Sequence, residues 1–151
     1  MGIGYNVKCS KCNYHKEFFL GSGMLFPVTY EKVQKKIMKG EYGDEWKSFL
    51  ERNPGAVFDG EKELYRCHKC NNLVEDYNLS LYLSKDGQPP EHGYWCNWGY
   101  HDREYRFVKS YVHKCPNCSR RMAKLNPDAS TSIPCPKCNS DLIIDGSILW
   151  D

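Results

Sequence analysis

Cysteine is the residue type in this chain whose number and spacing point most directly to chemistry. Eight of the nine cysteines fall into four Cys-x-x-Cys pairs. In chain order these are Cys9 and Cys12, Cys67 and Cys70, Cys115 and Cys118, and Cys135 and Cys138. A spacing of three lets one tight turn, a knuckle, direct both sulfurs at the same metal ion, and thiolates are ligands that zinc and iron accept. Two zinc ions with four cysteine ligands each would use all eight, and iron is the alternative metal.

The residue after the second cysteine of each knuckle supports this interpretation. That position usually needs a positive φ, which glycine adopts most easily and asparagine tolerates next best. The four positions are occupied by Asn13, Asn71, Ser119 and Asn139. Three of the four therefore carry the expected non-glycine substitute.

A tetrahedral structural zinc takes four ligands, so the knuckles must work in twos. Sixteen residues separate Cys118 from Cys135, which matches the spacing typical of a zinc site built from two such pairs. The third and fourth knuckles are therefore predicted to share one ion, and the first and second, by elimination, the other. An interleaved pairing stays open from sequence alone. Disulfides, free thiols and a thiol redox role are the competing interpretations of the same cysteines.

The ninth cysteine, Cys96, has no partner and lies between His92 and His101. Three protein ligands and a water describe a catalytic zinc, so this trio is a weak match to a third site. The alternative is an aromatic turn in which Trp95 and Trp98 fill space and Cys96 is a small buried residue.

The remaining sequence gives little support for catalysis. Four complete knuckles leave no open coordination position, and closed sites are structural. His68 and His113, each next to a knuckle, would change this only by replacing a cysteine ligand. No serine lies in a nucleophile-elbow context. We therefore expect a protein that is not an enzyme, without an evident small-molecule substrate.

The segments "KCPNC" and "PCPKC" resemble the Cys-Pro-x-Cys knuckles of zinc ribbons, which share the rubredoxin knuckle. The whole chain is similar to small uncharacterised bacterial zinc-ribbon proteins. The resemblance implies a structural zinc site of four cysteines held in a β-hairpin scaffold. Zinc ribbons include both nucleic-acid-binding and protein-docking modules, so the resemblance does not assign a function.

Composition and charge narrow the class of protein. The formal net charge is +2, but eight zinc-bound thiolates and two Zn²⁺ ions would change it to −2. No apolar run approaches the roughly 18 residues of a membrane span, and the N-terminus lacks the regions of a signal peptide. We therefore expect a cytoplasmic protein, where cysteines stay reduced and available for metal.

The periodicity predicts a small, metal-stabilised α+β fold with two β-rich zinc ribbons, the first carrying a two-helix insertion at about 25–54. The expected modules are 1–84, an aromatic connecting segment at 85–102, and a C-terminal ribbon at 103–151. The expected helices are 27–39 and 45–52, the second capped by Asp44. The expected strands are 13–20, 76–83, 103–114, and a closing hairpin over 141–151 with its turn at Gly146.

Charge is distributed unevenly along the chain. Between 103 and 124, seven basic residues face one acid, whereas the segment 41–63 is acidic. Basic residues interleaved with aromatics are typical of single-strand binding, and opposite charges at two ends of a protein suit protein contacts. The candidate contact residues are Trp95, Trp98, Arg103, Arg106, Lys109, Arg120, Arg121 and Lys124.

We expect a protein-docking or scaffolding module. The alternative is a nucleic-acid-binding zinc-ribbon protein that uses the segment 103–124. A metalloenzyme or a thiol redox protein ranks below both.

Overall fold

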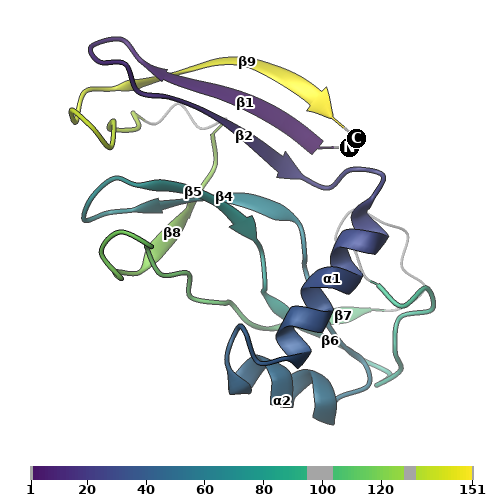
Figure 1. Ribbon diagram of the computed structural model, residues 1–151. Coiled ribbons are helices and arrows are strands. Elements are labelled where there is room, and N and C mark those ends of the chain that lie inside the picture. Colours follow the sequence, from purple (N-terminus) through teal and green to yellow (C-terminus); the bar gives the residue numbers. More distant parts are fainter. Residues whose placement is uncertain (1, 95–103, 128–131, 151) are drawn as a thin grey trace. The chain divides into compact units, whose positions relative to one another are not determined.

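Two compact units make up the chain. The computed structural model describes residues 2–94, 104–127 and 132–150 (Figure 1). One unit, here called the cysteine unit, consists of Met1–Gly23, Lys62–Asp76 and Val112–Asp151. The other, the helical unit, consists of Met24–Glu61 and Tyr77–Tyr111. Each unit combines separate segments of the sequence, so neither coincides with the continuous modules expected at 1–84 and 103–151.

The cysteine unit contains six antiparallel strands. They are β1 (Gly2–Cys9), β2 (His15–Gly21), β4 (Lys62–Cys67), β5 (Leu73–Tyr77), β8 (Met122–Leu125) and β9 (Leu142–Trp150). Their order is β5-β4-β2-β1-β9, and β8 pairs with β4 off this path. Two similar arrangements therefore occur: the hairpin β1–β2 with β9 on β1, and the hairpin β4–β5 with β8 on β4.

Alternating side chains give the cysteine unit its core. Along β1, Tyr5 and Val7 are buried, whereas Lys8 is exposed. Phe18 on β2 and Leu64 on β4 pack in the same cluster. A period of two places alternate residues on one face of a sheet, so these strands each present one apolar face to a shared interior.

The C-terminal hairpin expected over 141–151 is wrong. β9 runs as one strand from Leu142 to Trp150 and pairs with β1 along its length. The register shifts between Tyr5 and Asn6, where β9 has one extra residue, Gly146. Glycine indicated a turn, but pairing with β1 converts it to a β-bulge, a second role that glycine commonly has in strands.

The helical unit contains two helices and a three-stranded sheet. The elements are α1 (Phe26–Met38), α2 (Asp44–Arg52), β3 (Ala56–Phe58), β6 (Leu81–Ser84) and β7 (Tyr105–Lys109). The sheet has the order β3-β6-β7 and is antiparallel. Together the two units confirm the expected small α+β class.

Both helices lie where the sequence predicted them. α1 buries Phe26, Tyr30, Val33 and Ile37, whose spacing follows one helical face. It stops before Gly40, which has φ of 82° and suits a position just past a helix end. The expected cap at Asp44 is wrong, because Asp44 is already helical and Gly43 holds the N-cap position.

Two expected strands are shorter in the structure. The segment 76–83 divides into the end of β5 and β6, because Asn78 Oδ1 accepts a hydrogen bond from the Ser80 N–H at 3.0 Å and forms a turn. The segment 103–114 contains only β7 among its described residues. Its Tyr111 packs edge-on against Trp46, with ring centroids 5.1 Å apart. No helix in the described part of the chain is long and apolar enough to cross a membrane.

Candidate metal centres

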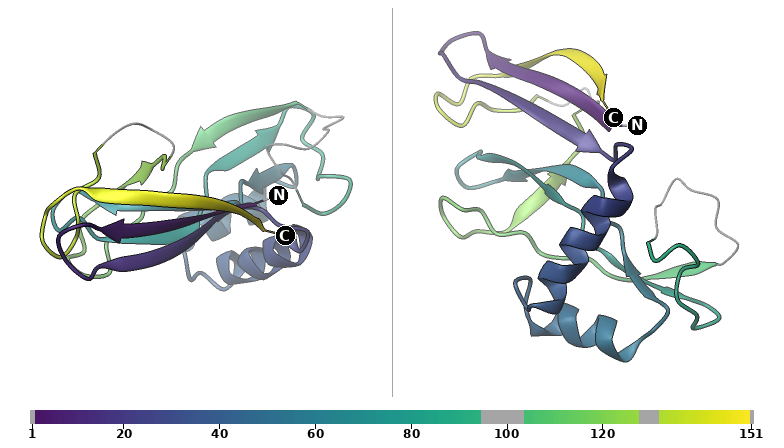
Figure 2. Two further views of the ribbon diagram at one scale, coloured as in Figure 1. Left: turned by 90° about the horizontal axis from the view of Figure 1, so that it is seen from above. Right: turned by 45° about the vertical axis from the view of Figure 1, so that its right-hand side comes forward.

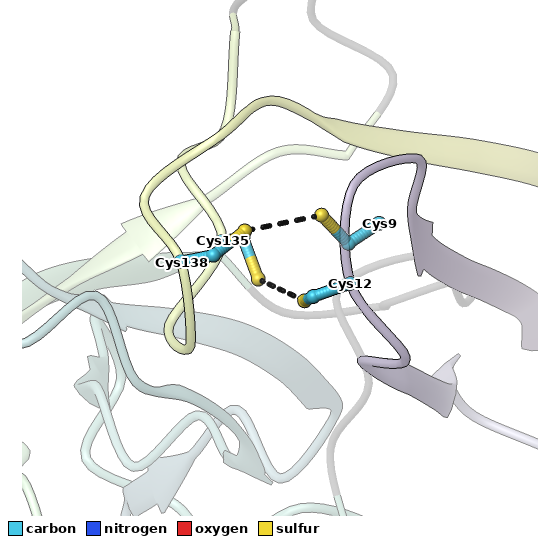
Figure 3. A group of neighbouring side chains, drawn as sticks. All are labelled: Cys9, Cys12, Cys135 and Cys138. Carbon is cyan, nitrogen blue, oxygen red and sulfur yellow. Dashed lines mark hydrogen bonds between the residues drawn. The ribbon is translucent and has the colours of Figure 1, made fainter.

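Four cysteine sulfurs meet at each of two places in the cysteine unit. The first centre consists of Cys9, Cys12, Cys135 and Cys138, and the second of Cys67, Cys70, Cys115 and Cys118. Within each centre the four sulfurs all lie within 4.8 Å of one another. Figure 3 shows the side chains of the first centre converging from two loops, one near the start of the sequence and one near residue 138.

The sulfur–sulfur distances fit a tetrahedral metal ion. Zn–S bonds of about 2.3 Å place tetrahedral ligands about 3.8 Å apart. In the first centre, Cys9 and Cys138 lie 3.4 Å apart, and Cys12 and Cys135 lie 3.6 Å apart. In the second, the corresponding distances are 3.4 Å for Cys67–Cys118 and 3.5 Å for Cys70–Cys115. A disulfide requires about 2.05 Å, so these cysteines are free thiols arranged as ligands.

This arrangement corrects the predicted pairing of knuckles. The first knuckle joins the fourth, and the second joins the third. The pairing expected from the 16-residue spacing between Cys118 and Cys135 is therefore wrong, although the eight ligand candidates are the predicted ones. Strand pairing provides the reason, since β9 follows Cys138 and pairs with β1, whereas β8 follows Cys118 and pairs with β4.

The sequence did contain a signal for the correct pairing. Only the third and fourth knuckles have proline after their first cysteine, at Pro116 and Pro136. In the structure their surroundings match as well. The backbone forms an isolated antiparallel β-bridge between Lys114 and Arg121 at the third knuckle, and between Pro134 and Asp141 at the equivalent positions of the fourth. The two knuckles are equivalent members of separate sites and not partners in one.

Backbone geometry holds each knuckle in shape. The N–H of the first cysteine donates to the carbonyl five residues later in all four knuckles, at 2.7 to 3.0 Å. Positive φ follows the second cysteine at Asn71 (57°), Ser119 (58°) and Asn139 (63°). This confirms the expectation for three knuckles; Asn13 is not among the residues with positive φ.

Amide groups point at the sulfurs, as a thiolate site requires. In the first centre, the N–H groups of Lys11 and Lys137 donate to Cys9 and Cys135 at 3.4 Å. The second cysteine of each knuckle interacts with the amide two residues later. These amides belong to Tyr14, Asn72, Arg120 and Ser140. Such donors stabilise negative charge on sulfur.

In the metal-free first centre, the thiols have different pKa values, because hydrogen-bond donors and burial act on them unequally. The backbone and side chain of Ser140 lower the pKa of Cys138 to about 6. The Tyr14 amide lowers the pKa of Cys12, but burial and hydrogen bonds to the other three cysteines outweigh it and raise that pKa to about 12. Four neighbouring thiolates repel one another, so full ionisation needs a cation among them.

A side-chain contact also links the two centres. Asn71 Nδ2 donates to Asn139 Oδ1 at 2.9 Å, and these residues directly follow Cys70 and Cys138. These two asparagines therefore have two roles: each adopts a positive φ, and together they form a contact between knuckles of different centres. The sequence indicated the first role only, because the second depends on long-range packing.

The histidines next to knuckles are not ligands in this arrangement. His68 is exposed. His113 is buried, its Nδ1 lies 3.2 Å from Asp76 Oδ2, and its ring packs on Tyr65 with centroids 3.9 Å apart. His113 precedes Cys115 by two residues, as the buried Ile133 precedes Cys135. It therefore occupies a core position of the repeated motif.

The candidate contact residues and the possible third metal site from the sequence have different outcomes. Some of these residues are not described, and the others belong to two different units. Trp95, Cys96, Trp98, His101 and Arg103 lie outside the described residues.

The basic segment is shared between units. Arg106 and Lys109 belong to the helical unit, and Arg120, Arg121 and Lys124 to the cysteine unit. Lys109 forms an ion pair with Glu45, and Lys124 Nζ lies 2.6 Å from Glu63 Oε1.

No family model, curated protein or solved structure matches the chain. What is established is therefore a small α+β protein with two groups of four cysteines that are arranged to hold metal ions.

Proposed function

We propose that this chain is a non-enzymatic zinc protein, in which two structural zinc sites of four cysteines each build a pair of zinc ribbons that serves as a docking or scaffolding module. The observation that carries the zinc assignment is the convergence of four sulfurs within 4.8 Å at each of two places. All four protein ligands of each ion are supplied by knuckles, which is the composition of a structural site.

The repeated topology supports the ribbon assignment. Each centre combines a knuckle inside a β-hairpin, β1–β2 or β4–β5, with a second knuckle that leads into a third strand. The third strand, β9 or β8, pairs with the first strand of the hairpin. A metal ion between the knuckles would fasten the third strand to the hairpin and add to the apolar packing of these strands.

Two double variants test the sites and their pairing together. Cys9→Ser with Cys135→Ser removes two ligands from the first centre and none from the second. We expect this protein to keep one zinc per chain, measured by elemental analysis and native mass spectrometry. Zero zinc would indicate the sequential pairing, in which these cysteines serve different ions.

The matched control exchanges one partner. Cys9→Ser with Cys67→Ser damages both centres, so we expect no stoichiometric zinc, whereas the sequential pairing leaves one ion. The intense visible absorption of iron–thiolate sites in unmodified protein would contradict the assignment of zinc. A wild-type content other than two metal ions per chain would contradict the proposed function itself.

Apolar side chains on the helical unit support the docking role. Met24 is 79% exposed, Leu25 is 69% exposed and Val28 is 48% exposed, around the start of α1. Val28 also lines a surface pocket of about 310 Å³ with His92 and Tyr94. Contiguous apolar side chains on a protein surface commonly mark an interaction site. We therefore assign this patch to an apolar segment of a partner protein.

A photo-crosslinking residue at position 28 tests this role in cells. We expect it to capture a discrete partner, whereas the same residue at the exposed position Lys32 of α1 captures none. The captured protein, once purified, is expected to bind wild-type chain and to lose binding to Val28→Asp. Equal binding to both would contradict docking at this patch.

Nucleic acid is the other outcome to measure. Fluorescence anisotropy with single- and double-stranded oligonucleotides at low salt is expected to show no binding. Binding that weakens with salt and is lost in Arg120→Glu with Arg121→Glu would favour the alternative, because phosphate contacts release counterions.

A further inference from the structure

The outer edge of β9 is available for pairing. β9 pairs with β1 along one side, and within the described ranges 2–94, 104–127 and 132–150 no strand pairs with its other side. Figures 1 and 2 show β9, in yellow, beside β1 at the margin of the sheet. An unpaired edge presents backbone N–H and C=O groups that readily form a ladder with another strand.

The composition of β9 offers little protection against such pairing. Natural edge strands are commonly short or carry lysine or proline. β9 has nine residues, and its sequence LIIDGSILW holds one charged residue, Asp145, and no proline. The bulge at Gly146 interrupts the strand once, but pairing with β1 continues on both sides of it.

Three aliphatic side chains of β9 are exposed: Ile143 at 46%, Ile148 at 60% and Leu149 at 66%. Ile143 lies opposite Lys8 and Ile148 lies opposite Gly4. Lys8 and Gly4 share one face of β1, since they are four residues apart. The two isoleucines therefore share a face as well, although five residues separate them, because the bulge adds one residue between them.

The sequence of β9 is self-complementary in an antiparallel arrangement. An apolar run, 142–144, precedes Asp145-Gly146-Ser147, and a second apolar run, 148–150, follows. Two copies of the strand paired about this centre bring the first run of one opposite the second run of the other. Residues directly opposite in an antiparallel pair share a face, so Ile143 of one copy is expected opposite Ile148 of the other. This register places the two-fold axis between Asp145 and Gly146.

We propose that two copies of this chain associate through antiparallel pairing of β9 with β9, which extends the β2-β1-β9 sheet across a two-fold axis. Such an interface is isologous, because each copy contributes the same surface. One strand with three aliphatic side chains is smaller than the about 800 Å² per partner of a standard interface. The dimer is therefore expected to dissociate on dilution.

Sedimentation velocity of the metal-loaded protein over a concentration series tests this proposal. We expect wild-type chain to pass from monomer to dimer as its concentration rises, and Ile148→Lys or Leu149→Lys to stay monomeric at every concentration. Leu25→Lys is the matched control, because Leu25 is 69% exposed and lies in the helical unit. It should dimerise like wild type.

A crosslinking experiment identifies the contacting strand. A photo-crosslinking residue at position 143 is introduced, and the protein is mixed with ¹⁵N-labelled wild-type chain. Crosslinked peptides that join unlabelled and labelled chains report contacts between copies. We expect these crosslinks to fall within residues 142–150 of the labelled chain.

The outcomes separate this proposal from the proposed function. Metal content is measured for every variant and is expected to equal that of wild type, which shows that the first centre, next to β9, is intact. A wild-type chain that binds two metal ions but stays monomeric throughout overturns the dimer alone. A dimer that persists in both β9 variants, or crosslinks confined to other segments, overturns it as well.

Discussion

The residue after the second cysteine carries the clearest local requirement in each centre. Asn71, Ser119 and Asn139 have positive φ, a region that costs ordinary residues about 1–2 kcal/mol. Asparagine tolerates it because its short polar side chain makes local hydrogen bonds. A serine in this position is less usual, so Ser119 is the best place to measure the cost.

We expect Ser119→Val to lower the free energy of unfolding by about 1–2 kcal/mol, because a β-branched side chain is disfavoured at positive φ. Ser119→Gly should leave stability unchanged or raise it. Urea unfolding of the metal-loaded protein measures both. Ser110→Val, at an exposed position without positive φ, is the control and should change little.

Proton competition sets the pH dependence of metal binding. In the metal-free protein, the pKa of Cys12 and that of Cys70 are raised to about 12, so both thiols are protonated at neutral pH. Binding must release these protons, and metal affinity therefore falls as pH falls. A competition titration with a chromophoric chelator between about pH 6 and pH 8 measures this. An affinity independent of pH would show that the thiolates form without metal.

At the scale of elements, α1 shows how the helical unit is held without cysteine ligands among its described residues. Tyr30 stacks on Phe58 with ring centroids 4.0 Å apart, and its hydroxyl oxygen accepts a hydrogen bond from the Phe58 N–H at 3.2 Å. Ile37, at the other end of the helix, is fully buried. Apolar packing on one helical face therefore stabilises this unit.

Truncation of this face should be costly. We expect Ile37→Ala to destabilise the helical unit by about 2–5 kcal/mol, since the deletion leaves a cavity in the core. Met38→Ala, at the neighbouring and 37% exposed position, should cost less than about 1 kcal/mol. Thermal unfolding followed by far-UV circular dichroism measures the difference. Equal effects would contradict the assigned helical face.

Local features of the elements could be predicted from sequence, and long-range ones could not. Cysteine spacing gave the knuckles, and the spacing of Tyr30, Val33 and Ile37 gave α1, because both depend on nearby residues. Gly146 indicated a turn, yet pairing with the distant β1 makes it a bulge. The partner of each knuckle likewise depends on strand pairing across the chain.

At the scale of the whole molecule, both units have an apolar core, but they differ in their described cysteine ligands. Both described groups of four cysteines lie in the cysteine unit. The helical unit has its own core of buried residues, which includes Tyr30, Trp46 and Leu81. Removal of metal should therefore affect the units unequally.

We expect a chelator to remove the protection of amides in β1 and β4 from hydrogen exchange, while amides of α1 keep part of theirs. Structural metal sites contribute folding free energy directly to the strands beside them, whereas the core around α1 contains no described cysteine ligand. Hydrogen exchange followed by mass spectrometry measures both sets. Unchanged protection in the strands after complete metal removal would contradict a structural role for the metal.

The nested pairing of knuckles gives the chain an order of assembly during synthesis. The second centre spans residues 67–118, whereas the first spans 9–138. As the chain leaves the ribosome, Cys118 emerges before Cys135, so the second site is complete while the first still has only two ligands. The first centre can be completed only after translation passes residue 138, so we expect its first knuckle to wait for its partner. When the fourth knuckle joins the first, the chain segment between them contains the whole second centre.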